Sequence, residues 1–375
     1  MPVSGESVPV SAPAPAYAAR RAAVAAGLTR RGADALVVSD LVNVRYLTGF
    51  TGSNGAVLIR ADGGGTGDRI ATDGRYTAQV AAQTPDVTAV IARDTLAALV
   101  AEAAGARVGI EADAVTVAQF QTLREEPGGD GATLVPLRGV VEELREVKDD
   151  GEVALVTRAC AVADAALTAL IERGAIAPGR TERQVARDLE WEMYERGASG
   201  IAFETIVAAG AHSAVPHHRP TDAVLATSDL VKIDFGAMVD GYHSDTTRTV
   251  VLGEPAPWQR EIHEIVRVAQ EAGTRALTPG ADLRAVDATA RQVIADAGYG
   301  EFYVHGLGHG VGLRIHEAPG IGATATGTLL RGAIVTVEPG IYLPGRGGVR
   351  IEDTLAVTES GSRSLTHTPR ELRVL

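Results

Sequence analysis

Three histidines in the segment HGLGHGVGLRIHE have a spacing that could support metal or acid-base chemistry. His305, His309 and His316 follow one another at intervals of four and seven positions. Neutral imidazole is a common ligand of divalent metal ions and a common proton donor or acceptor near neutral pH. A single histidine in a glycine-rich loop is more often solvated than functional, so these three need partners elsewhere in the chain. The remaining candidates for such solvated side chains are His212, His218, His243 and His263.

Two aspartates lie in a predicted β-hairpin with the sequence IDFGAMVDGYHSDTT. The pair Asp240-Gly241 is typical of a two-residue type I′ turn. Counting outward from this turn pairs Asp234 with Thr247 and puts Asp245 on the same face as Asp234, diagonally across the ladder. A three-residue loop would instead put the two aspartates on opposite faces.

Two carboxylates on one face of a strand pair repel each other unless a positive charge lies between them. Arg248 is close in sequence, but its side chain is expected on the other face of the hairpin. We therefore predict that a cation lies between Asp234 and Asp245. The alternative is that both are strand-end carboxylates that face water.

Two glutamates in the last part of the sequence supply further carboxylates. Glu338 ends the β-rich run AIVTVEPG, where Pro339 stops regular strand pairing. Glu352 lies in GGVRIED, and Arg350 shares its face two residues earlier, where it is expected to pair with the carboxylates. Four carboxylates and one of the three histidines suit two bridged divalent ions, such as Mn²⁺ or Co²⁺, about 3.5–4 Å apart.

The composition excludes several other classes of protein. The 375 residues carry a formal net charge of −12 and have a pI near 5.3, which argues against a nucleic-acid-binding surface. A single cysteine, Cys160, excludes a disulfide within the chain. Residues 1–19 are rich in Pro, Ala and Ser and lack the pattern of a secretory signal, so they are interpreted as a disordered tail. The uninterrupted apolar runs of the chain are shorter than a bilayer requires. We therefore expect a cytoplasmic protein with a small or peptidic substrate and without nucleic-acid or membrane partners.

The chain divides into two predicted domains, residues 20–146 and residues 147–375. The first alternates helical stretches with short β-rich runs, as an α/β domain does. The polar segment REVKDDGE interrupts this pattern and marks the boundary.

The second domain contains an internal repeat. Residues 175–197 align with residues 276–298 without gaps at an offset of 101, and Thr181 and Asp282 are the matching candidate helix N-caps. We interpret the repeat as a duplication whose halves face each other across a pseudo-two-fold axis and contribute ligands to one central site. Two ordinary amphipathic helices with generic caps are the alternative.

With these residues in place, the chain resembles the pita-bread metallopeptidases (peptidase family M24), which include methionine aminopeptidase, aminopeptidase P, prolidase and the metal-free creatinase. In the first domain, NVRYLTGFTGSNGAVLI and ATDGRYTAQV are similar to segments of the proline-specific branch. In the second, SAVPHH, VKIDFGAMVDGYHSDTTRT, HGLGHGVGLRIHE, TVEPGIY and GGVRIED occur in family order. The resemblance implies an α/β fold class, with an N-terminal creatinase-like α/β domain followed by a C-terminal pita-bread α+β domain.

The resemblance also implies roles for individual residues. The implied metal ligands are Asp234, Asp245, His309, Glu338 and Glu352, with Asp245 and Glu352 bridging two ions. The implied catalytic residues are Glu338, His217, His305 and His316, and the implied substrate contacts are His217, His305, His316 and Arg350. Asn43 departs from the family pattern at a position where some relatives use an aspartate near the substrate amine, so the resemblance does not carry that contact over to Asn43.

The activity that the resemblance implies is that of a dinuclear metal-dependent exopeptidase, acting on the Xaa-Pro bond at the N-terminus of dipeptides or short peptides. It implies two divalent ions per subunit, with manganese preferred over cobalt, zinc or iron, and a homodimer. Xaa-Pro dipeptidase and aminopeptidase P both fit the motifs. A methionine aminopeptidase-type activity and a catalytically silent pita-bread binding module are the alternatives; the extra first domain argues against the former and the complete ligand set against the latter.

Overall fold

The computed structural model describes residues 16–62, 67–125 and 132–375, and these residues form two compact units. The first unit ends at Arg145 and the second runs from Glu146 to Leu375. Helix α1 (Tyr17–Leu28) includes residues 17–19, so the predicted disordered tail is too long at its C-terminal end. The rest of that tail, residues 1–15, lies outside the described residues.

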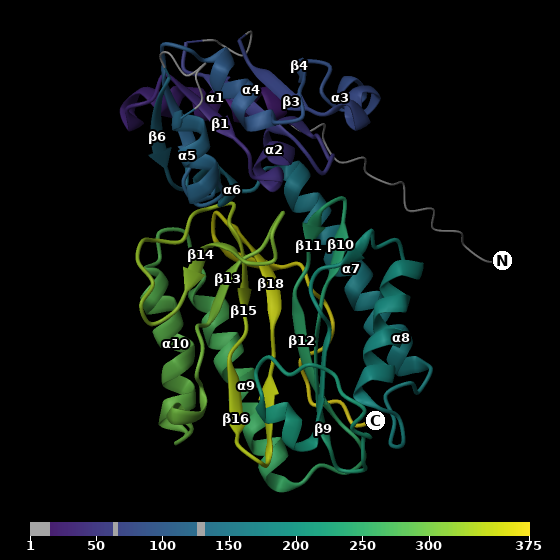
Figure 1. Cartoon of the computed structure of the whole chain (residues 1–375). Helices are drawn as coiled ribbons and strands as arrows, with labels where there is room; N and C mark the ends of the chain where they lie inside the picture. The colour runs from purple at the N-terminus through teal and green to yellow at the C-terminus, as the bar shows by residue number, and fades with distance from the viewer. Residues whose placement is uncertain (1–15, 63–66, 126–131) are drawn as a thin grey trace, which may run out of the picture. The chain divides into compact units, whose positions relative to one another are not determined.

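The N-terminal unit contains one mixed sheet with the strand order β4-β3-β2-β1-β5-β6 (Figure 1). Its strands are β1 (Ala35–Val38), β2 (Ala56–Arg60), β3 (Arg69–Thr72), β4 (Thr88–Ile91), β5 (Arg107–Glu111) and β6 (Thr133–Leu137). After α1, its helices are α2 (Leu41–Thr48), α3 (Thr77–Gln83), α4 (Thr95–Glu102), α5 (Val117–Glu125) and α6 (Glu142–Arg145). The pairs β3–β4, β1–β5 and β5–β6 are parallel and each includes a helical connection, so the unit has the predicted α/β character.

Asn43 is buried inside the N-terminal unit rather than available to a substrate. Its Nδ2 donates to Glu111 Oε1 at 2.7 Å and to Glu142 Oε1 at 2.6 Å, and its Oδ1 accepts from Arg145 at 2.7 Å. The side chain thus joins α2 to β5 and α6. Every polar atom of the amide thus has a partner within this unit.

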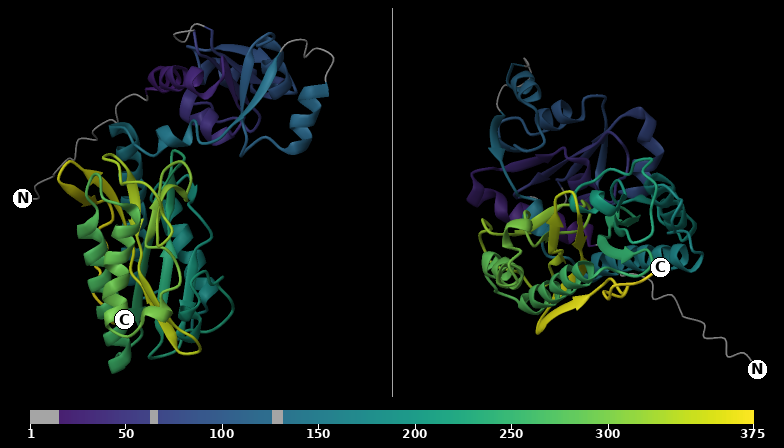
Figure 2. Two further views of the ribbon diagram at one scale, coloured as in Figure 1. Left: turned by 90° about the vertical axis from the view of Figure 1, so that its left-hand side faces the viewer. Right: turned by 90° about the horizontal axis from the view of Figure 1, so that it is seen from below.

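The C-terminal unit consists of two halves, each of which begins with a pair of helices and continues with β-strands. The first half contains α7 (Asp150–Glu172), α8 (Glu182–Glu195), β7 (Gly200–Ile201), β8 (Ile206–Ala209), β9 (Leu230–Phe235), β10 (Ala237–Val239), β11 (Tyr242–His243) and β12 (Thr246–Val251). The second contains α9 (Pro257–Ala276), α10 (Leu283–Asp296), β13 (Gly308–Gly310), β14 (Glu317–Ile321), β15 (Ile334–Val337), β16 (Gly340–Leu343), β17 (Gly347–Arg350), β18 (Asp353–Thr358) and β19 (Gly361–Ser364). Helices α9 and α10 run side by side in each view, and the helix pairs α7–α8 and α9–α10 flank the strands (Figures 1 and 2).

The internal repeat is a structural duplication. Helices α8 and α10 each have 14 residues, and their ends correspond at the predicted offset of 101. Thr181 caps the first through its side chain and Asp282 caps the second. The preceding glycines, Gly179 and Gly280, have φ values of 90° and 83°, and each donates its N–H to the carbonyl of a leucine later in the same half, Leu225 and Leu329 respectively. The two helices thus share their length, their N-caps, a preceding glycine and its hydrogen bond. Two unrelated amphipathic helices would not require all of these features in common.

The predicted hairpin register is confirmed. Asp240 and Gly241 both have positive φ, 46° and 75°, as a type I′ turn requires. Val239 pairs with Tyr242, and Asp234 pairs with Thr247. The strand pairing counted outward from the turn therefore holds as far as the two aspartates, without a β-bulge.

Helix α7 is the one helix among the described residues whose length and apolar composition would allow it to cross a membrane. Half of its apolar window is buried inside the folded unit. The buried face includes Cys160, and the helix packs on α8 and β10 within the core of the first half. This burial is that of a core helix in a folded domain.

Candidate metal and active site

A cavity of about 290 Å³ in the C-terminal unit collects the predicted metal ligands. Its volume is near the lower end of the range of small-molecule sites. The residues that line it are Phe203, Glu204, Ile206, His217, His218, Arg219, Asp234, Asp245, His309, Ile315, His316, Glu338 and Glu352. All five predicted ligands are in this set, together with two of the three predicted substrate-binding histidines.

Four of the cavity carboxylates come in pairs from the two halves of the duplication. Asp234 is on β9 and Asp245 directly precedes β12 in the first half. Glu338 follows β15, and Glu352 lies between β17 and β18 in the second half. The Glu352 N–H donates to the Thr247 carbonyl at 3.0 Å, which joins the halves at the site. The four carboxylates therefore share a space because strands of both halves end around it.

His309 presents an unprotonated nitrogen to this group of carboxylates. Its Nδ1 lies 3.0 Å from the Gly310 carbonyl oxygen, which can only accept, so Nδ1 carries the proton. Its Nε2 lies 3.5 Å from Asp245 Oδ2 and 3.5 Å from Glu338 Oε1. Burial lowers the pKa of His309 to about 4, so the ring is neutral near pH 7. A lone pair that faces two carboxylates is unfavourable without a cation between them.

The electrostatics of the carboxylates also fit a bound cation. Burial, reinforced by Glu352, raises the pKa of Asp245 well above its usual range, and burial likewise raises the pKa of Glu352. Burial raises the pKa of Glu338 to about 7, although Arg350 opposes the shift. Asp234 Oδ1 is buried without a hydrogen-bond partner. Candidate ligand atoms of Asp245, His309 and Glu352 lie within 4.8 Å of one another, so the residues fit a divalent metal site.

Arg350 contacts the predicted metal ligands but does not line the cavity. Its guanidinium pairs with Asp234 Oδ2, and its Nε donates to Thr247 Oγ1 at 3.0 Å. Its remaining nitrogen donates to Tyr342 OH at 2.9 Å and to the Pro216 carbonyl at 3.1 Å. The guanidinium is fully buried and is absent from the cavity lining, so its observed contacts hold the ligands and their neighbours.

The three predicted substrate-binding histidines have different surroundings. His217 and His316 line the cavity, and the His316 ring meets that of His309 edge to face at a centroid distance of 4.4 Å. His305 is absent from the lining; its Nδ1 lies 2.8 Å from the Gly306 carbonyl and its Nε2 lies 2.8 Å from Tyr342 OH. Since the carbonyl fixes the proton on Nδ1, the Tyr342 hydroxyl donates to His305 Nε2. His305 is thereby joined to Arg350 through Tyr342.

Several residues around the site were missed by sequence reasoning. Thr247 Oγ1 donates to Glu352 Oε2 at 2.7 Å while it accepts from Arg350. Tyr342 links Arg350 to His305. Counting the strand register pairs Thr247 with Asp234. Nothing in the sequence, however, indicates that the threonine hydroxyl joins Glu352 to Arg350.

Two histidines interpreted as solvated are instead largely buried. His263 is 3% exposed, and burial lowers its pKa to about 4. The His218 side chain is 10% exposed and lies 2.8 Å from Glu182 Oε2. The buried Glu182 could not be distinguished in sequence from the other charged residues of α8.

The chain is similar to two known domain families and to several solved metallopeptidases. Residues 154–359 match the model described as metallopeptidase family M24, and residues 20–147 match the creatinase/prolidase N-terminal domain. Xaa-Pro dipeptidase from Pyrococcus furiosus is 46% identical over 233 residues, which cover 62% of this chain and 66% of that protein. The structure of Xaa-Pro dipeptidase from Bacillus anthracis has a TM-score of 0.90 and 37% identity, and the match covers 96% of this chain and 100% of that one. The X-Pro aminopeptidase from Thermotoga maritima has a TM-score of 0.83 and 34% identity, covering 92% and 97%.

Proposed function

Because the chain belongs to metallopeptidase family M24 and carries a creatinase/prolidase-type N-terminal domain, we propose that it is a dinuclear exopeptidase for the Xaa-Pro bond at the N-terminus of dipeptides or short peptides. The observation that supports this most directly is the cavity lined by four carboxylates and a neutral imidazole. Relatives named Xaa-Pro dipeptidase and X-Pro aminopeptidase support the proline specificity. The family match and the complete ligand set argue against the catalytically silent binding module.

The proposed metal ligands divide between two ions. Asp234 would bind one ion, Asp245 and Glu352 would bridge both, and His309 and Glu338 would complete the second site. Divalent ions held there, preferably manganese, would supply Lewis acidity and lower the pKa of water to about 7. Arg350, through its pair with Asp234, would hold that carboxylate in one orientation.

The bond before proline requires a proton donor from the enzyme. Its nitrogen is tertiary, so it has no N–H and must be protonated as it leaves. Glu338 lines the cavity between His309 and Arg350, with one oxygen 3.5 Å from His309 Nε2 and the other 4.0 Å from Arg350 Nε. We assign Glu338 the transfer of a proton from the attacking water to the proline nitrogen.

His217 and His316 are assigned to the substrate carbonyl. Both line the cavity beside the ligands, and an imidazole N–H could donate to the oxygen on which negative charge develops during attack. A donor of this kind contributes about 2.7–4 kcal/mol in other hydrolases. His305, which is joined to Tyr342, would act on the site through that hydroxyl. We further propose that the enzyme is a cytoplasmic homodimer.

The test is hydrolysis of Ala-Pro and Ala-Pro-Ala by chelator-treated protein, before and after addition of Mn²⁺. The expected result is that added Mn²⁺ restores cleavage of at least one of these substrates, whereas Ala-Ala and Met-Ala-Ala are cut at least tenfold more slowly. Preference for Met-Ala-Ala would instead indicate a methionine aminopeptidase. Failure to cut any peptide at full metal occupancy would reject the proposed activity.

The role of Glu338 is tested by Glu338→Gln in the Mn²⁺-loaded protein. Glutamine retains one ligand oxygen but cannot carry the proton, so turnover should fall below about 1% of wild type while metal remains bound. Glu301→Gln, at an exposed position in the same half, is the matched control and should retain wild-type activity. Near-normal turnover by Glu338→Gln would contradict the assignment.

A further inference from the structure

The loop that carries His217 is attached at several points to one buried carboxylate. Glu182 is the first residue of α8, and its side chain is fully buried. Its Oε1 accepts from the Ala209 N–H and faces His212 Nδ1, both at 2.9 Å. Its Oε2 accepts from the Thr221 N–H at 3.0 Å and Thr221 Oγ1 at 2.8 Å, and faces His218 Nε2 at 2.8 Å. The contacts lie on both sides of His217 in sequence.

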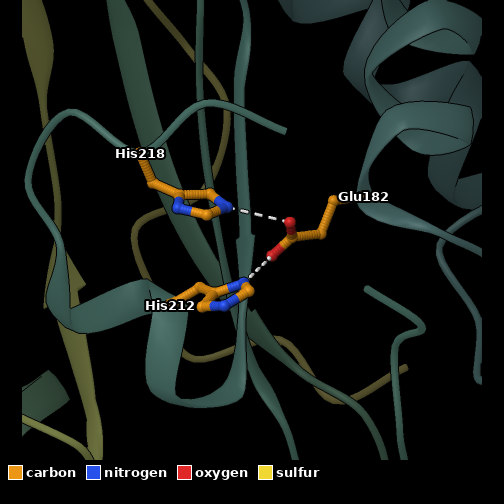
Figure 3. A group of neighbouring side chains, drawn as sticks. All are labelled: Glu182, His212 and His218. Carbon is orange, nitrogen blue, oxygen red and sulfur yellow. Dashed lines mark hydrogen bonds and ion pairs between the residues drawn. The ribbon is translucent and has the colours of Figure 1, made fainter. Parts of the chain in front are cut away.

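His212, on the short 3-10 helix η3 (Gly210–Ala214), and His218, on the loop that follows it, both point at Glu182 (Figure 3). The rings of His212 and His218 stack with a centroid distance of 4.4 Å and an interplanar angle of 28°. Hydrogen bonds from Ala209, His218, Thr221 and His212 outweigh the effect of burial and lower the pKa of Glu182 to about 2. The carboxylate is therefore charged, and its position in the first turn of α8 is one that a helix dipole favours for an anion.

Two buried basic side chains hold the other side of the same loop. Lys232, on β9, donates its Nζ to the carbonyls of Val215 and Pro216, the two residues before His217. Arg350 also donates to the Pro216 carbonyl, at 3.1 Å. Hydrogen bonds from Lys232 and Arg350 thus hold the residues just before His217, and the Glu182 carboxylate binds residues on both sides of it.

A metal ion is a poor alternative for the group of Glu182, His212 and His218, although their ligand atoms are close enough to be considered. Two backbone N–H groups and the Thr221 hydroxyl already point their hydrogens at the Glu182 oxygens. These donors would repel a cation at the same oxygens. The ring nitrogens are at hydrogen-bond distance, so the contacts are complete without a metal.

We propose that Glu182 is a positioning residue for His217. By binding the loop at Ala209, His218 and Thr221, Glu182 holds His217 in the cavity that also contains the metal ligands. The proposal rests on the proposed function, in which His217 donates to the substrate carbonyl. Residues 215–223, which include His217, belong to no helix or strand, so their position depends on these side-chain contacts.

The kinetic test compares Glu182→Gln with Glu195→Gln, an exposed glutamate at the end of the same helix. The amide introduced by Glu182→Gln would turn an N–H₂ group toward donors that now bind an oxygen. With Mn²⁺ saturating, kcat on Ala-Pro should fall about 10- to 100-fold with metal content unchanged, because a shift of about 1 Å in a catalytic group has effects of this size. Glu195→Gln should retain wild-type kcat.

A double-mutant comparison shows whether the effect passes through His217. In a His217→Ala background, Glu182→Gln should lower kcat by less than about twofold, since the group that it positions is already gone. An equal loss in both backgrounds would overturn the proposal. Wild-type kcat in Glu182→Gln alone would also overturn it.

A second pair of variants applies if Glu182→Gln does not fold. Thr221→Val removes the hydroxyl that donates to Glu182 and accepts from the Ala223 N–H, and Thr221→Ser retains it. Thr221→Val should lower kcat several-fold, and Thr221→Ser should restore it to within about twofold of wild type. Equal kcat for Thr221→Val and wild type would contradict the positioning role.

Hydrogen exchange separates this proposal from the proposed function. In the intact chain, Glu182→Gln should increase amide exchange at Ala209 and Thr221, whatever the enzyme cleaves. If wild type cut no Xaa-Pro peptide but this exchange increased, the activity would be rejected and the attachment of the loop upheld. Unchanged exchange would overturn the attachment. The attachment would also be overturned if wild type bound one equivalent of Zn²⁺ that Glu182→Gln does not bind, because the cluster of Glu182, His212 and His218 would then be a metal site.

Discussion

Removing the hydroxyl of Thr247 should weaken metal binding without touching a ligand. Thr247 Oγ1 donates to Glu352 Oε2 at 2.7 Å and accepts from Arg350 Nε at 3.0 Å, and all three side chains are buried. Thr247→Val retains the shape and the β-branch but loses both contacts. Glu352 then loses a donor that orients it, whereas Arg350 retains its pair with Asp234.

The expected size of this effect follows from what the hydroxyl contacts. Hydrogen bonds to charged groups contribute about 1.5–3 kcal/mol, and removing a partner of a metal ligand costs about 10- to 100-fold in metal affinity. A 10- to 100-fold weaker Kd for Mn²⁺ corresponds to about 1.4–2.8 kcal/mol. We expect Thr247→Val to fall in this range.

Thr249→Val is the matched control. Thr249 is on the same strand and equally buried, but its hydroxyl donates to the backbone carbonyl of Arg350 at 3.1 Å and contacts no ligand carboxylate in the described hydrogen bonds. Competition between the protein and a fluorescent chelator measures Mn²⁺ affinity for both variants, and circular dichroism checks the fold. Wild-type affinity in Thr247→Val, or an equal loss in Thr249→Val, would refute the reasoning.

Three further predictions concern the histidines, pH and acid stability. His309→Ala should reduce bound Mn²⁺ by about half or more at stoichiometric metal. His316→Ala and His305→Ala should instead retain the metal and lower kcat at least tenfold, and metal analysis combined with kinetics distinguishes these outcomes. Because burial raises the pKa of Glu338 to about 7, metal binding must displace a proton below that pH, so affinity for Mn²⁺ should rise as the pH increases toward 7. Calorimetry in buffers of different ionisation enthalpy should detect proton release at pH 6, and its absence would count against the site. The pKa of Glu182 is about 2 in the folded protein and near 4.5 when unfolded, so its contribution to stability is present above pH 4.5 and lost as pH falls toward 2. Urea unfolding at pH 6 and pH 3.5 should therefore show a greater acid loss for wild type than for Glu182→Gln, and equal losses would contradict it.

Much of the fold, and the shared face of Asp234 and Asp245, could be predicted because local rules determine them. The two-residue turn at Asp240-Gly241 sets the register, and the period of two along a strand then puts Asp234 and Asp245 on one face. Helix caps repeat at a fixed offset in α8 and α10. The family match confirms the predicted fold class, a creatinase-like N-terminal domain followed by a pita-bread domain.

The interactions that could not be predicted join residues far apart in sequence. Arg350 contacts Asp234 across 116 positions, and Thr247 contacts Glu352 across 105. Asn43 contacts Glu111 across 68 positions and Glu142 across 99. Strand propensity and turn chemistry carry no information about such partners.

The sequence by itself determined which carboxylates share a hairpin face, where the repeated helices begin and end, and which chemistry the residues could support. Only the tertiary structure decided that His217 and His316 line the cavity while His305 bonds to Tyr342, and that Glu182 binds the loop around His217. The physical reason is that alternation and capping act over a few neighbouring residues. The surroundings of a buried side chain depend instead on how strands and loops from both halves pack around it.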